Sequence, residues 1–291
     1  MQEELFHYCS TDSFHSIVST QSIRLSSLSL SNDTMEGKIV AQALVRLAVA
    51  DGLDDDSTER LLSSFDTIER KFDGLGFCLS EEGDLLSQWR GYAADASGIS
   101  IGFSTAYLDK LQNRNILDQA INDPLVQLHQ VKYSTDEHDT QVSPAYAEVR
   151  KAIDKGAFRF SQTKGLLDLR TESEIAQENK QNTEALHRAF SALFTLFPKL
   201  FVLKSNAFRE EREWRLLSHL IWERSDDCSY RPIHGRLIPY RLLILPKLDA
   251  PAITKVVLGP KHITPPSMIA DFLKKSGFPD VEVIKSVATY R

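Results

Sequence analysis

Residues 209–217 carry the charged side chains whose spacing best suits chemistry. If residues 211–217 form a strand, its two-residue period places Glu211, Glu213 and Arg215 on one face. Neighbouring carboxylates repel each other unless solvent, cations or a function offset the repulsion. The segment is therefore either a candidate carboxylate site or a solvated sheet edge whose negative charge nearby arginines neutralise. Taken alone, the segment favours the second interpretation. Such repulsion predicts that neutralising Glu213 leaves stability unchanged or slightly higher.

The pair His7 and Tyr8 near the N-terminus is a second candidate. A histidine on a short strand, followed by polar residues and then a helix, can offer a ring N–H to a ribose hydroxyl. Tyr8 or Tyr92 would provide an aromatic surface for a planar ring. A single histidine is still more often structural, so this pair alone does not establish a site.

Three short motifs fail because their context is wrong. Residues 98–102 match the G-x-S-x-G nucleophile elbow, but apolar alternation continues through them, so Ser100 is predicted to lie in the middle of a strand and not to be a nucleophile. Gly74 and Gly76 precede a strand, where a phosphate-binding loop would precede a helix. Residues 161–164 match S-x-x-K without its companion motifs.

Composition excludes several classes of protein. The 291 residues include 34 Lys+Arg and 40 Asp+Glu, a net charge of −6, which argues against non-specific packaging of nucleic acid. The 8 histidines form no paired zinc motif and the 3 cysteines no CxxC, so we expect no metal and a reducing compartment. No apolar run could span a bilayer, so we expect a soluble, cytoplasmic protein without membrane partners.

The periodicities predict one α+β domain over residues 1–291, with a helical insertion at about 136–200. Strand patterns dominate both ends of the chain. Strands are predicted at 5–8, 23–28, 75–79, 98–103, 125–133, 211–217, 237–245, 253–258 and 281–284. Helices are predicted at about 11–18, twice within 33–72, and at 84–92, 145–160, 172–200 and 267–275.

The order of several motifs resembles a widespread bacterial family catalogued only as a domain of unknown function. The resemblance covers most of the chain and is weakest at residues 104–200. The motifs are Phe6-His7-Tyr8-Cys9-Ser10, Ser31-Asn32-Asp33 with Glu36, Phe77-Cys78-Leu79-Ser80-Glu81, Trp89-Arg90-Gly91-Tyr92-Ala93, Gly98 to Phe103, and Phe208 to Arg215.

The opening strand, helix and strand, with a late Glu-x-Glu strand, are also similar to ADP-ribosyltransferases of the His-Tyr-Glu type. This resemblance implies a split mixed β-sheet that holds NAD as substrate, without a metal. It implies that His7 contacts the nicotinamide ribose and that Tyr92 stacks on nicotinamide, a role that Tyr8 could take instead. Glu213 would bind the ribose 2′-OH and stabilise an oxocarbenium-like transition state.

In the same resemblance Glu211 would orient the acceptor, and Arg24 and Arg90 are candidates for the phosphates. The acceptor would be an unidentified protein or nucleic acid, or water in an NAD glycohydrolase. Family resemblance also suggests bacterial defence or toxin function. His7 and Glu213 are then expected to line one pocket although they lie 206 positions apart in the chain.

Two other functions stay open. One is a metal-dependent nuclease or phosphodiesterase, with Asp33, Glu36, Glu211 and Glu213 holding Mg²⁺. The other is a recognition module that keeps the fold without catalysis. Dependence on NAD would separate the first hypothesis from both, and activity restored by Mg²⁺ after EDTA would favour the nuclease.

Overall fold

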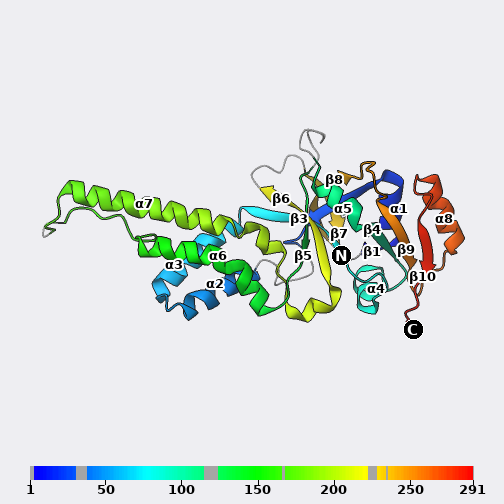
Figure 1. Cartoon of the computed structure of the whole chain (residues 1–291), viewed down its shortest axis with the longest axis horizontal. Coiled ribbons are helices and arrows are strands. Elements are labelled where there is room, and N and C mark those ends of the chain that lie inside the picture. The colour runs from blue at the N-terminus through cyan, green and yellow to red at the C-terminus, as the bar shows by residue number, and fades with distance from the viewer. Residues whose placement is uncertain are drawn as a thin grey trace.

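The computed structural model describes residues 3–30, 38–114, 124–165, 168–221, 228–233 and 235–290. Within these ranges the protein is α+β, with an open, mixed sheet (Figure 1). The strands are β1 (Glu4–Cys9), β2 (Ser22–Ser27), β3 (Phe72–Ser80), β4 (Ile99–Ser104), β5 (Gln127–Gln130), β6 (Glu213–Ile221), β7 (Ser229–Ile233), β8 (Arg236–Ile244), β9 (Ile253–Leu258) and β10 (Glu282–Lys285).

Helices cover the sheet and extend from one end of it. They are α1 (Thr11–Thr20), α2 (Lys38–Ala50), α3 (Asp55–Glu69), α4 (Leu86–Tyr92), α5 (Thr105–Gln112), α6 (Thr135–Asp154), α7 (Glu172–Phe194), α8 (Pro266–Lys275), and the 3₁₀ helices η2 (Phe197–Phe201) and η3 (Asn206–Glu211). Ser10 caps α1, as its residue type predicts, by accepting a hydrogen bond from the backbone N–H of Ser13 at 3.2 Å.

The strand order is β10-β9-β4-β1-β3-β2-β8-β7, and β6 pairs with both β3 and β5. The pairs are antiparallel except β9 with β10, which makes the sheet mixed. β1 is paired with β4 along its whole length, from Glu4 opposite Ser104 to Cys9 opposite Ile99. Its register with β3 consists of one pair, Phe6 opposite Ser80. The two halves of the sheet therefore join through a short contact.

Two large clusters of buried apolar side chains lie in different parts of the fold. The first packs α1, α5 and α8 against the sheet, with Phe14 and Tyr107 buried in it. The second joins α2, α3, α6, α7 and η2 into a helical layer that reaches away from the sheet in Figure 1. The predicted insertion at 136–200 supplies α7 and nearly all of α6 and η2 to this layer, and residues before β3 supply α2 and α3.

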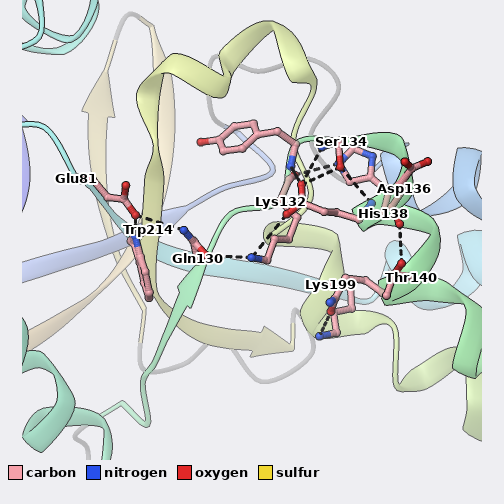
Figure 2. A network of polar contacts seen from close by, with 12 residues as sticks. Glu81, Gln130, Lys132, Ser134, Asp136, His138, Thr140, Lys199 and Trp214 are labelled. Carbon is pink, nitrogen blue, oxygen red and sulfur yellow. Dashed lines mark hydrogen bonds and ion pairs between the residues drawn. The ribbon is translucent and has the colours of Figure 1, made fainter. Parts of the chain in front are cut away.

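α6 begins at Thr135, earlier than the predicted helix at 145–160, and it contains Pro144. A capping box explains the early start: Ser134 accepts from the backbone N–H of Glu137, whose carboxylate accepts from that of Ser134. His138 then donates from Nε2 to the Lys132 carbonyl at 3.0 Å, which ties the helix to the end of the sheet (Figure 2).

The strand predicted at 211–217 is shifted. β6 begins at Glu213, while Glu211 closes η3. Between them Arg212 takes a left-handed conformation with φ of 43°, which breaks the strand alternation. Ser100 lies in β4 opposite Tyr8 of β1 with no exposed surface, so its predicted position in mid-strand is confirmed.

None of the helices described here is long and apolar enough to cross a membrane.

Candidate functional site

A cavity of about 720 Å³ lies where β1 and β3 join, within the usual range for small-molecule sites. Among the residues that line it are His7, Tyr8, Arg24, Tyr92, Glu211 and Glu213. It thus brings together six of the seven predicted site residues, from segments far apart in the chain. Arg90 is not one of its lining residues, because its guanidinium lies over the Tyr290 ring, 5.8 Å from the centroid.

The two carboxylates are joined by a buried lysine that the sequence reasoning missed. Lys204 Nζ lies 2.6 Å from Glu211 Oε2 and 2.9 Å from Glu213 Oε2. Arg215 clamps Glu213 from the other side, with Nε 2.7 Å from Oε1 and Nη2 3.1 Å from Oε2. The site is therefore a neutral group of two anions and two cations, and the expected repulsion is offset. A lysine directly after the apolar run 200–203 was the available signal.

These charges are nearly removed from solvent: Glu213 is 5% exposed and Arg215 2%. Burial opposes the ionisation of Glu213, but the attraction of Arg215 and Lys204 outweighs it and lowers the pKa to about 2. The same carboxylates raise the pKa of Lys204 although burial opposes it. Glu213 is thus an anion and Lys204 a cation at neutral pH. Oε2 of Glu213 already accepts from Lys204 and Arg215, whereas Oε1 accepts from Arg215 Nε and has a second lone-pair position for a ligand.

Hydrogen bonds from neighbouring segments fix the backbone of Glu211 and Glu213. Ser80 Oγ donates to the Glu211 carbonyl at 2.7 Å, and the Tyr133 hydroxyl accepts from the Glu213 N–H at 2.8 Å. Trp214, next in β6, donates its indole N–H to Glu81 at 2.9 Å (Figure 2). The contacts come from the end of β3 and from the segment that enters α6. The carboxylate positions are therefore fixed before any ligand binds.

Tyr92, the last residue of α4, places its ring at the cavity. Its hydroxyl donates to Glu211 Oε1 at 3.0 Å, and the residue is 44% exposed. Burial of the hydroxyl and the charge of Glu211 raise its pKa, so it stays protonated. The chain then turns through left-handed residues at 94–96, closed by a bond from the Ala96 N–H to the Trp89 carbonyl at 2.9 Å.

His7 is oriented differently from the sequence expectation. Nδ1 lies 2.8 Å from the Cys78 carbonyl, which can only accept, so Nδ1 carries the ring proton. The ring stacks on Phe77, with 4.0 Å between centroids. Burial lowers the pKa of His7 to about 4, so the ring is neutral. The expected ring N–H is thus already used, and Nε2 is a hydrogen-bond acceptor.

Tyr8 is part of the framework. Its hydroxyl donates to the Glu82 carbonyl and accepts from the Leu85 N–H, both at 2.8 Å. Its ring packs edge-to-face with that of Trp89, with 4.8 Å between the ring centroids, and Tyr8 is 5% exposed. Of the two candidate tyrosines, Tyr92 has the more accessible ring.

The magnesium hypothesis depends on Asp33 and Glu36, which lie outside the described residues. Within the described part of the chain, no group of three or more His, Cys, Asp or Glu side chains is arranged to hold a metal. Lys204 occupies the position between Glu211 and Glu213 where those two carboxylates would share a cation.

Comparison with known proteins gives a family match without a function. No curated protein and no solved structure is significantly similar to the chain. Residues 88–216 match the family described as protein of unknown function (DUF2971). The match contains Tyr92, Lys204, Glu211 and Glu213 and ends one residue after Arg215.

Proposed function

We propose that the cavity binds NAD and that the protein breaks the bond between nicotinamide and ribose, passing ADP-ribose to a macromolecular acceptor or to water. One observation carries the proposal: a single cavity holds a neutral His7, the ring of Tyr92 and the fixed carboxylates of Glu211 and Glu213. The proposal includes a sheet of the split ADP-ribosyltransferase type, which the one-pair junction of β1 with β3 supports.

The charge distribution suits this reaction. Loss of nicotinamide takes the electron pair of the C–N bond and leaves positive charge on the ribose ring. A carboxylate that is already ionised and oriented stabilises that charge without reorganising during the reaction. Glu213 would accept from the ribose 2′-OH, while Lys204 and Arg215 keep it deprotonated and in place.

His7, Tyr92 and Glu211 would each contact a different part of the substrates. Nε2 of His7 would accept from a ribose hydroxyl, because Nδ1–H is held by Cys78. The exposed ring of Tyr92 would stack on nicotinamide. The acceptor's nucleophilic atom then bonds to the ribose carbon, and its proton passes to Glu211 and on to solvent.

The test is nicotinamide release from NAD by the purified protein, with and without cell extract as a source of acceptors. We expect release by the wild type and a loss of about 10²-fold in Glu213→Gln, the scale of a lost preorganised electrostatic group. Glu148→Gln is the matched control, because Glu148 pairs with Lys151 on the exposed surface of α6.

NAD labelled in its adenylate half distinguishes transfer, which labels macromolecules, from hydrolysis. The proposal is wrong if the folded wild type releases no nicotinamide under either condition. Hydrolysis of nucleic acid that is lost in EDTA and restored by Mg²⁺ would then identify the nuclease instead.

A further inference from the structure

One wall of the cavity is formed by one face of β2, β8 and β7. Strand alternation places Arg24 on this face of β2, Arg236 on that of β8 and Arg231 on that of β7. Arg24 lies opposite Leu242, and Arg231 lies opposite Ile238. Adjacent strands thus bring three guanidinium groups to one wall, and only Arg24 was singled out from the sequence.

These arginines have no counter-charge among the described residues. Arg24 Nη2 lies 3.4 Å from Ser16 Oγ and its guanidinium 5.4 Å from the Tyr240 ring centroid, while Arg231 Nη2 donates to Ser26 Oγ at 3.0 Å. The Nε of Arg231 is buried and has no hydrogen-bond partner. Burial and the positive charge of Arg24 lower the pKa of Arg231. A bound anion would remove this uncompensated charge.

Hydroxyl groups continue the polar wall. Ser13, Ser16 and Thr20 follow the three- and four-residue spacing of one face of α1, and all line the cavity. Ser22 and Ser26 lie on the same face of β2 as Arg24. Guanidinium N–H groups and hydroxyls are the donors that phosphate oxygens accept from most readily.

Apolar side chains lie between the arginines. Ile238, Tyr240 and Leu242 alternate along the cavity face of β8. Such a surface, with a tyrosine ring under Arg24, suits a flat, weakly polar group next to the phosphates. The wall therefore matches a ligand that combines phosphate with a planar ring, as a nucleotide does.

We propose that Arg24, Arg231 and Arg236 bind the diphosphate of a nucleoside diphosphate, with the base on the Tyr240 side of β8. The inference rests on the proposed function for the choice of adenosine as nucleoside, and it places the ADP half of NAD at this wall. Nicotinamide then lies toward Tyr92 and Glu213. Binding at this wall requires no bond cleavage.

Calorimetric titration of the whole protein with ADP, adenosine and inorganic pyrophosphate tests the proposal. We expect ADP to bind more tightly than adenosine, and pyrophosphate to compete with ADP. Arg231→Gln and Arg24→Gln should each weaken ADP binding by about tenfold or more, because each removes a charge-assisted contact, while adenosine binding changes little.

Arg70→Gln is the matched control: it removes the same charge from the exposed end of α3, where Arg70 pairs with Asp66, and should leave ADP affinity unchanged. Arg236→Gln and Arg24→Gln carry the test if Arg231→Gln does not fold. The proposal is overturned if adenosine binds as tightly as ADP, or if folded cavity variants bind ADP like the control.

The two proposals fail separately. Arginine-dependent ADP binding without nicotinamide release would contradict only the proposed reaction. Release of nicotinamide by a protein whose ADP affinity ignores these arginines would contradict only this inference.

Discussion

The imidazole Nδ1 of His7 lies 2.8 Å from the backbone oxygen of Cys78. The backbones of β1 and β3 pair only at Phe6 and Ser80, so this side-chain hydrogen bond is a second link between the two strands. The bond requires a protonated Nδ1, and the buried ring, with its pKa of about 4, remains neutral. The same geometry that joins the half-sheets therefore makes the protein sensitive to acid.

We predict that His7 contributes a pH-dependent part of stability between pH 4 and 6.5. In this window the unfolded chain protonates the histidine and the folded one does not, so the free energy of unfolding falls as pH falls. The span of the shift corresponds to about 3 kcal/mol. Urea unfolding of wild type and His7→Gln at pH 4.5 and 7 measures it, since other groups cancel in the difference.

His187→Gln, at an exposed position of α7, is the control for that experiment. It should reproduce the wild-type pH dependence. Equal pH dependence in wild type and His7→Gln would show that His7 is not held neutral in the fold.

Local sequence patterns predicted many helices and strands correctly, because these elements depend on residues that are close together in the sequence. The apolar alternation through residues 98–102 identified β4, and α1 follows the polar residues after Tyr8 as expected. The helix predicted at 145–160 begins instead at Thr135, because the capping box of Ser134 and Glu137 starts it.

The carboxylate site shows what local patterns cannot provide. Glu211 and Glu213 were identified from their spacing, but a strand period does not reveal that Arg212 is left-handed or that Lys204 lies between the two carboxylates. Arg231 presents the same problem. Its role depends on strand pairing between segments far apart in the chain, and pairing cannot be read from periodicity alone.

Lys204→Met is predicted to destabilise the protein by about 3–5 kcal/mol at pH 7, because it leaves a buried carboxylate without its partner. Adding Glu211→Gln should recover part of the loss, since it removes the carboxylate that has lost its cation, whereas Glu213 keeps its pair with Arg215. Chemical denaturation of the single and double variants measures both effects. Lys151→Met, which breaks an exposed pair with Glu148, should cost less than about 1 kcal/mol. A loss no larger in Lys204→Met than in this control would contradict the buried network.

Glu213→Gln is predicted to destabilise the protein, which corrects the expectation from sequence that neutralising it is harmless. The pKa of Glu213 is lowered to about 2, so its ionisation stabilises the fold above the unfolded pKa, and that contribution is lost as pH falls from 4.5 toward 2. The variant should thus lose stability at pH 7 and differ less from wild type at pH 3. Thermal midpoints at both pH values test this, and a difference that does not shrink in acid would exclude the titration of Glu213 as its cause.

Asp84 should fasten the segment after β10 to the helix that carries Tyr92. One oxygen accepts from the Trp89 indole N–H at 2.7 Å and from the Ser286 hydroxyl, and the other from the Val287 N–H at 2.7 Å. Partial burial opposes its ionisation, but these bonds lower its pKa, so the carboxylate is charged at neutral pH. Asp84→Ala leaves the indole N–H without its partner and should cost about 1–3 kcal/mol.

Ala288 and Tyr290 of this segment also pack against the apolar cluster that contains Trp89. Release of the segment should therefore expose residues near 286–290 to proteases before the sheet unfolds. Limited proteolysis followed by mass spectrometry measures this, with Asp109→Ala on the exposed surface of α5 as control. If Tyr92 depends on this attachment, Asp84→Ala should also weaken nicotinamide release without changing arginine-dependent ADP binding. Unchanged protease sensitivity would mean that the β10 pairing and the apolar contacts hold the segment without Asp84.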